Sequence, residues 1–172
     1  LTAVTSSGNT ADDIRVDMRA LYAQFIAANN TPTNGVWIMS STTALAMSLM
    51  VNALGQREFP GVEILGGRLN GLPVITSEYL PTDSNGSIVM LVNASDIYLG
   101  DEGGVRIDIS REASLEMSDS PSHDSDTPTA AQLVSMFQTN SVAFRAERII
   151  NWKARRTSAV ALLDSVNWGD SI

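Results

Sequence analysis

Hydrophobic and polar positions follow a clear order along residues 35–50. Residues 36–39 form a continuous apolar run of the kind that fills a buried strand. Ser40 and Ser41 follow directly, and their side-chain oxygens accept hydrogen bonds from the free N–H groups that begin a helix. Gly55 stands just beyond the next apolar stretch, where a left-handed C-cap is least costly for glycine. This pattern predicts a buried strand, a capped turn and a helix that packs back onto a sheet.

An amphipathic helix is predicted at residues 11–28. Thr10 is a suitable N-cap, and Asp12 and Asp13 stand in the first turn, where carboxylates interact favourably with the helix dipole. Pro32 ends the pattern, because the residue before a proline is disfavoured in helical geometry. Apolar residues recur with the spacing of one helix face: Ile14, Met18, Leu21, Tyr22, Phe25 and Ile26. Such a face packs either into the core or onto a partner, and the core is the favoured interpretation.

The middle of the chain has the pattern of short strands separated by turns. Asn70 and Gly71 suit a turn with positive φ. Strands are predicted at residues 62–65, 72–76, 87–92 and 97–99. Apolar and polar residues then alternate as in half-buried strands, with apolar side chains at Val105, Ile107, Ile109, Ala113, Leu115 and Met117. The expected fold class is therefore α+β, with a mixed β-sheet and flanking helices.

The C-terminal third begins with a polar stretch, residues 118–129, which is predicted to be a surface loop. Residues 130–138 are predicted to form a short helix. From 140 to 155 the alternation is longer than an ordinary strand, so this strand is expected to bend or bulge, or to belong to an extended, flat subunit. Residues 159–163 form a closing apolar run.

Composition excludes several classes of protein. The 172 residues carry a formal net charge of −8, which argues against non-specific nucleic-acid binding as the main activity. There is no cysteine, so disulfides, thiolate nucleophiles and thiolate metal sites are absent. The longest apolar runs are too short to cross a membrane. The chain starts at Leu1 without an initiator methionine or a signal sequence, and it is expected to be a fragment or a processed product.

The sequence supports no catalytic, cofactor-binding or metal site. His123 is the one histidine, and a triad with Asp124 and a serine is conceivable, but no strand–turn–helix G-x-S-x-G context surrounds any serine. The favoured interpretation is a solvated loop histidine. Asp119, Asp124 and Asp126 lack the central glycine and distal glutamate of a calcium loop. We therefore expect a protein that is not an enzyme and that needs no cofactor.

One biased feature is basic, in a chain that is otherwise acidic. Five cationic residues lie close together in one segment of the sequence: Arg145, Arg148, Lys153, Arg155 and Arg156. They form either an exposed charged strand face or a subunit interface that meets acidic surfaces of neighbouring copies through arginine's bidentate geometry. Nucleic acid is a poorer partner, because the aromatic residues in and beside this basic segment are limited to Phe144 and Trp152.

The order of four segments resembles the C-terminal part of the major capsid proteins of tailed bacteriophages, which have the Hong Kong 97-like shell fold. The first is the helix 11–28 leading into Val36-Trp37-Ile38-Met39-Ser40-Ser41. The second is Gly66-Gly67-Arg68-Leu69-Asn70-Gly71-Leu72-Pro73-Val74, similar to the family's turn-strand L-x-G-x-P-V. The third is the strand pair within 87–106. The last is 137–163, with Arg145-Ala146-Glu147-Arg148 and a closing small-apolar run.

The resemblance implies an axial-type α+β domain at residues 10–104 and the long antiparallel strands of a peripheral-type domain at 105–164. It implies a structural subunit whose copies form pentamers and hexamers of an icosahedral shell around the genome. The implied partners are other copies, a scaffolding protein, a maturation protease and a portal during assembly, and packaged DNA without sequence-specific contact; no membrane is implied. The implied location is the virion, after assembly in the cytoplasm of a host bacterium. No crosslinking residue is transferred.

Two alternatives stay open at this point. A cellular nanocompartment of the encapsulin type shares the shell fold and differs in what it encloses. A soluble α+β enzyme is the other class, and it would need a concave pocket where His123 meets a serine and a carboxylate.

Overall fold

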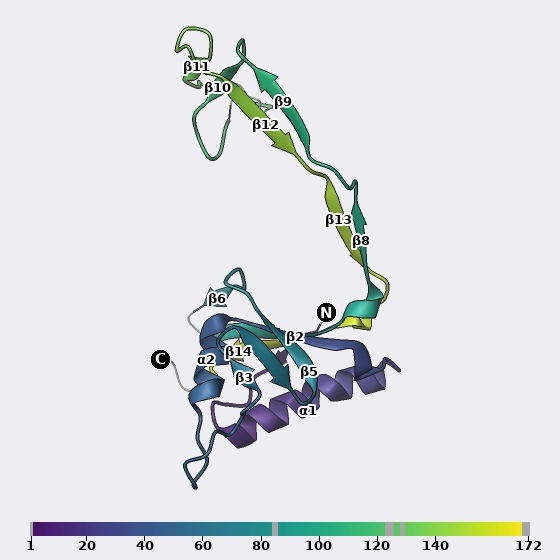
Figure 1. Cartoon of the computed structure of the whole chain (residues 1–172). Coiled ribbons are helices and arrows are strands. Elements are labelled where there is room, and N and C mark those ends of the chain that lie inside the picture. Colours follow the sequence, from purple (N-terminus) through teal and green to yellow (C-terminus); the bar gives the residue numbers. More distant parts are fainter. Residues whose placement is uncertain (1, 84–85, 123–125, 128–129, 170–172) are drawn as a thin grey trace. The chain divides into compact units, whose positions relative to one another are not determined.

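The chain forms two compact units in a computed structural model that describes residues 2–83, 86–122, 126–127 and 130–169. The first, here called the sheet unit, contains Leu1–Tyr98 and Trp152–Ile172. The second, called the ribbon unit, contains Leu99–Asn151. Figure 1 shows the helices and the large sheet in one part of the chain and paired strands in the other.

The sheet unit is built on a mixed sheet with the strand order β1-β14-β7-β2-β5-β4-β3, and β6 pairs with β7 beside this path. β2 runs parallel to β5 and antiparallel to β7, which makes the sheet mixed, as the sequence predicted. The strands are β1 (Val4–Thr5), β2 (Gly35–Met39), β3 (Val62–Glu63), β4 (Gly66–Leu69), β5 (Leu72–Thr76), β6 (Thr82–Asp83), β7 (Gly86–Asn93) and β14 (Val160–Val166). Short 3-10 helices precede β2, β8 and β14, at Pro32–Asn34, Ala94–Asp96 and Thr157–Ala159.

Two helices begin at the caps that the sequence indicated. α1 (Ala11–Ala27) starts with a capping box, in which the Asp13 N–H donates to Thr10 Oγ1 at 3.3 Å and the Thr10 N–H donates to Asp13 Oδ2 at 3.1 Å. α2 (Ser41–Leu49) is capped by Ser40, whose Oγ accepts from the Thr43 N–H at 3.1 Å. The expected C-cap at Gly55 is wrong. α2 ends at Leu49, and Gly55 occupies a later turn with φ 75°.

Both helices pack on one face of the sheet. The Tyr22 ring meets Trp37 edge-on, with ring centroids 5.6 Å apart. The shared core confirms the predicted core face of α1 except at Ile26, which is 68% exposed. Members of this core include Ile14, Leu21, Phe25, Ala44, Met47, Trp37, Met39, Val74, Leu91 and Leu163. The alternate residues of β2, β5, β7 and β14 lie on the other face, and they are only partly buried or exposed.

A buried carboxylate connects the two ends of the sheet unit to α1. Asp17 accepts hydrogen bonds from Ser6 Oγ at 2.7 Å, from the Ser7 N–H at 2.9 Å and from Ser7 Oγ at 2.7 Å. It also accepts from Trp168 Nε1 at 2.9 Å. Beside this cluster β1 pairs in parallel with β14, Val4 opposite Leu163. One side chain of the first helix therefore joins the segment between β1 and α1 to the segment after β14.

The ribbon unit consists of paired strands. β9 (Arg106–Ser110) pairs with β12 (Ala143–Glu147), and β10 (Ser114–Glu116) pairs with β11 (Leu133–Ser135). β8 (Ile97–Asp101) pairs with β13 (Ile150–Ala154), and the division between the units falls within these two strands. The expected long strand at 140–155 is thus two strands, separated at residues 148–149.

The helix expected at 130–138 is wrong. Leu133–Ser135 forms β11, with Val134 opposite Leu115 in antiparallel register. Isolated helices this short are marginal in water, so the pairing with β10 decides the conformation of the segment.

The chain crosses between the units twice, whereas a single boundary after residue 104 was expected. β14 belongs to the sheet unit and not to the second domain, because Val160 lies opposite Val92 and Leu163 opposite Val89 in antiparallel pairing with β7.

Candidate functional site

The ribbon formed by β9 and β12 has one apolar face. Phe144 lies opposite Ile109, and Ala146 lies opposite Ile107, so these side chains share a face. Ile107 and Ile109 are each 63% exposed and Phe144 is 71% exposed. The expectation of half-buried strands is wrong for this pair, because nothing in the described chain covers the face. Contiguous exposed apolar side chains of this kind mark interaction surfaces.

The apolar character continues at the β10–β11 end of the ribbon unit. A groove of ≈ 360 Å³ is lined there by Leu115, Met117, Val134, Met136, Val142 and Phe144, among others. Among the described residues of the ribbon unit, Met136 is the one hydrophobic side chain that is buried. Two-stranded ribbons without a buried core are marginally stable in water. The ribbon unit therefore has the properties of a surface that is completed by contact with another body.

The other face of the same ribbon is charged. Arg145 lies opposite Asp108, and Glu147 lies opposite Arg106. Arg145 also pairs with Glu147 along its own strand, Nη2 to Oε2 at 2.5 Å. The ribbon is thus amphipathic, with an apolar face for contact and a charged face suited to water.

A bulge interrupts the ribbon between its two strand pairs. Residues 102–105 separate β8 from β9, while 148–149 separate β12 from β13. The first connection is longer than the second, and Gly103, with φ 79°, helps to accommodate its extra residues. The Glu102 N–H donates to the Ile149 carbonyl oxygen at 3.2 Å. The backbone thus stays partly paired across the bulge.

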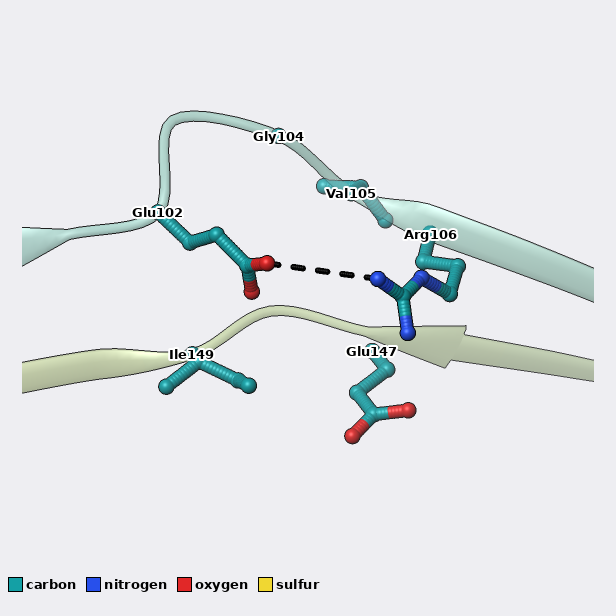
Figure 2. Close-up of a pocket in the computed structure, with 6 residues that line it drawn as sticks. All are labelled: Glu102, Gly104, Val105, Arg106, Glu147 and Ile149. Carbon is teal, nitrogen blue, oxygen red and sulfur yellow. Dashed lines mark ion pairs between the residues drawn. The ribbon is translucent and has the colours of Figure 1, made fainter.

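The bulge encloses an open pocket of ≈ 320 Å³, lined by Glu102, Gly104, Val105, Arg106, Glu147 and Ile149. Figure 2 shows Glu102 and Arg106 reaching toward each other, with 3.9 Å between carboxylate and guanidinium. The lining residues include no hydroxyl, thiol or imidazole side chain that could act as a nucleophile or be paired with a base. The pocket thus supplies charges and backbone, and no catalytic arrangement.

Arg148, in the other strand connection of the bulge, forms an ion pair with Asp101 at the end of β8. The Arg148 Nε donates to Asp101 Oδ1 at 3.3 Å, and Nη2 donates to Oδ2, which makes the pair bidentate. The hydrogen bond from Arg148 lowers the pKa of the Asp101 carboxyl below its ordinary value of 3.8, and the Gly103 N–H at 3.0 Å adds to this effect.

Replacement of Arg148 by glutamine is expected to raise the pKa of Asp101 toward its ordinary value. The lowered pKa means that the pair stabilises the fold above the unfolded-state pKa, and that this contribution is lost as the pH falls through the folded-state pKa. Carboxyl chemical shifts followed by NMR between neutral and acid pH measure the change. Arg145→Gln serves as the control, since Arg145 pairs with Glu147 instead. An unchanged Asp101 titration in Arg148→Gln would contradict this assignment.

The five basic residues expected at a subunit interface do not form one free stripe. Arg145 and Arg148 pair with carboxylates inside the ribbon unit. In the sheet unit, Arg155 Nη1 and Arg156 Nε lie 4.0 Å and 3.9 Å from Oδ1 of the nearly buried Asp96. Lys153 is exposed and has no ion pair with any residue that the structure describes. Their role at an interface stays a prediction.

The structure describes only part of the set of residues weighed for catalysis and metal binding. His123 and Asp124 lie outside the described residues. Across the part of the chain that the structure describes, no three His, Asp or Glu side chains are grouped so as to hold a metal ion. No helix among the described residues is long and apolar enough to span a membrane.

The apolar ribbon face was not predicted as a candidate site from the sequence. Its signal was present in the alternation at Ile107, Ile109 and Phe144. A two-stranded ribbon with no facing element leaves such residues open, but alternation alone does not distinguish this case from a half-buried strand.

The sequence matches the phage capsid family over residues 1–165. The capsid polyprotein of Pseudomonas phage PAJU2 is 64% identical over 168 residues, which cover 96% of this chain and 25% of the relative. The chain therefore spans about a quarter of the length of this curated relative.

Solved structures show the same fold at low identity. The structure titled "Mycobacterium phage Che8" has a TM-score of 0.58 at 16% identity. The match covers 95% of this chain and 53% of the chain in that structure. That of "Gordonia phage Cozz" has a TM-score of 0.60 at 14% identity, over 94% and 49%. "Capsid of empty GTA particle computed with C5 symmetry" has a TM-score of 0.58 at 19% identity, over 95% and 49%.

These likenesses confirm the expected α+β shell fold. The family match and the identity with the Pseudomonas phage protein confirm the resemblance drawn from the four sequence segments. The chain belongs to the phage capsid family.

Proposed function

We propose that the chain is part of the major shell protein of a tailed phage or prophage, and that its copies join into pentamers and hexamers around the packaged genome. The observation that carries the proposal is the apolar face of the ribbon, where Ile107, Ile109 and Phe144 are exposed in the single chain. Membership of the phage capsid family supports a structural role. A shell subunit needs extended surfaces that other copies cover, and the ribbon supplies one.

The two units take different parts in this proposal. The sheet unit serves as the axial-type domain that meets its neighbours around the local symmetry axes. The ribbon unit serves as the peripheral-type domain. The basic residues contribute at interfaces between copies, and exposed Lys153 is the strongest candidate because the four arginines lie near carboxylates of their own chain.

The proposed location is the virion, after assembly in the host bacterial cytoplasm. A scaffolding protein, a maturation protease and a portal are the proposed assembly partners. Contact with packaged DNA is proposed to be without sequence preference, in keeping with the chain's net charge of −8. The nanocompartment and the soluble enzyme are less favoured, since the 64% identical relative is a phage capsid polyprotein.

Negative-stain electron microscopy of the purified protein tests the proposal, and rings or closed shells are expected. Ile107→Glu is expected to weaken self-association by roughly a hundredfold or more, because an unpaired carboxylate buried against an apolar surface costs several kcal/mol. Sedimentation velocity measures the loss.

Asp108→Asn is the matched control, since it changes one charge on the opposite face of the same strand and should leave assembly intact. The melting temperature of Ile107→Glu should stay near that of the parent, because Ile107 is largely exposed. Rings that form equally well with Ile107→Glu would count against the ribbon face as the contact surface.

A further inference from the structure

A polar pocket of ≈ 290 Å³ in the sheet unit is lined by α1 and by two loops. One side is formed by α1 residues at helical spacing: Arg15, Met18, Arg19 and Tyr22. The rest of the lining consists of Glu58 and Phe59, which precede β3, and Asn70, in the turn between β4 and β5. A concave site with a few convergent polar groups is suited to a small ligand.

Arg19 brings an unneutralised positive charge to this pocket. Its side chain is exposed and forms no ion pair with any residue that the structure describes. Arg15, in contrast, pairs with Glu58 and, at 2.8 Å, with Asp12. The lining therefore holds two positive side chains and one negative one, which matches a ligand with a single negative charge. Because a guanidinium donates two parallel N–H groups, it binds a carboxylate in bidentate geometry.

Tyr22 and Asn70 add uncharged hydrogen-bond donors to the pocket. The Asn70 Nδ2 donates weakly to Met18 Sδ at 3.5 Å, and its second N–H remains for another acceptor. Burial raises the pKa of the Tyr22 hydroxyl, so this group keeps its proton at neutral pH and can donate it.

A buried polar group beside Tyr22 lacks a partner. Among the residues that the structure describes, Trp37 Nε1 is the one buried side-chain nitrogen or oxygen without a hydrogen bond. The Tyr22 hydroxyl is near enough for Trp37 to influence the pKa of Tyr22, but it is not aligned as an acceptor. A hydroxyl that donates its proton to a ligand directs its lone pairs elsewhere, and the Tyr22 oxygen can then accept from the indole N–H. A ligand that accepts from Tyr22 would thus satisfy the buried indole as well.

We propose that this pocket binds a small monocarboxylic acid, whose carboxylate pairs with Arg19 and accepts from Tyr22 and Asn70. Met18 and Phe59 supply apolar contact for a short stem. The bound acid connects α1 to the turn between β4 and β5, so it is expected to raise the melting temperature. The inference concerns the sheet unit alone and does not depend on how copies assemble.

Isothermal titration calorimetry of the full chain with butyrate tests the inference. A dissociation constant on the order of 1 mM is expected for a ligand with so few heavy atoms. Arg19→Gln should bind butyrate at least about tenfold more weakly, because it removes a charge-assisted bidentate contact. Tyr22→Phe should also weaken binding, since it removes one donor and keeps the ring beside Trp37.

Two matched controls accompany these variants. Arg111→Gln removes an exposed arginine that does not line the pocket, so it should bind butyrate as the parent does. Butyramide has the shape of butyrate without its charge and should bind far more weakly. Inorganic phosphate should also bind more weakly than butyrate, because it carries more than one negative charge at neutral pH and Glu58 would repel it.

Equal binding of butyrate by Arg19→Gln and the parent would overturn the inference, because the acid would then lie elsewhere. Arg19 is exposed, so Arg19→Gln should melt with the parent in the absence of butyrate, and a loss of binding would not reflect unfolding. Butyramide that binds as tightly as butyrate, or phosphate that binds more tightly, would overturn the assignment to a carboxylate. Absence of saturable butyrate binding to the parent would overturn the site itself.

Discussion

Replacement of Asp17 by alanine is expected to lower the free energy of unfolding by about 3–5 kcal/mol, which is the range for breaking a buried charged hydrogen-bond network. The carboxylate accepts from both Ser6 and Ser7 and from the indole of Trp168. Alanine leaves the buried indole N–H without an acceptor and frees the segment that precedes α1. Urea unfolding followed by circular dichroism measures the change.

Asp12→Ala is the matched control for this variant. Asp12 lies in the same helix, but its side chain is almost fully exposed and forms an ion pair with Arg15. Its loss should cost less than about 0.5 kcal/mol. Asp17→Asn should fall between the two, since it keeps a carbonyl oxygen as an acceptor. A loss in Asp17→Ala as small as that in Asp12→Ala would show that the network does not hold the ends of the sheet unit together.

Gly67→Ala is the second change with a large expected effect, a loss of about 2–5 kcal/mol from backbone strain and steric overlap together. Gly67 lies in β4 with φ 123°, which side-chain-bearing residues rarely adopt. A Cβ there would overlap the carbonyl oxygen of Gly61, which already accepts from the Arg68 N–H at 2.7 Å. The overlapping atom is backbone, so relief requires a shift of the chain. Thermal unfolding measures the loss.

Gly71→Ala and Gly104→Ala separate the two causes. Gly71 has φ 81° but open space around a Cβ, so only the conformational cost of about 1–2 kcal/mol is expected. Gly104 has neither a strained φ nor a close neighbour, and its replacement should be nearly neutral. Equal losses for Gly67→Ala and Gly71→Ala would show that the chain near Gly61 yields easily.

Local chemistry made the first helix and the strand–helix pair predictable. Thr10 and Ser40 are caps whose action depends on residues only three positions away. The positive φ expected at the Asn70–Gly71 turn is also present, at 51° and 81°. Each of these features is decided within a few residues, so a sequence pattern carries enough information to identify it.

Features decided by distant parts of the chain were not predictable in the same way. β11 was expected to be a helix because its partner, β10, could not be identified from spacing. The carboxylate that binds Arg148 comes from Asp101, 47 positions earlier. The basic segment was recognised as unusual from the sequence. Its ion pairs could not be predicted, because they depend on which strands lie side by side. The return of β14 to the first sheet was missed for the same reason.

The registered pairing of Val92 with Val160 has a topological consequence. The chain leaves the sheet at the end of β7 and re-enters it at the start of β14, one strand spacing away, or about 4.8 Å. Two neighbouring antiparallel strands need only a two-residue turn to connect them. The sheet therefore contains a complete hairpin into which the ribbon unit is inserted. Such an insertion can lengthen, shorten or be exchanged for another without altering a single pairing of the sheet.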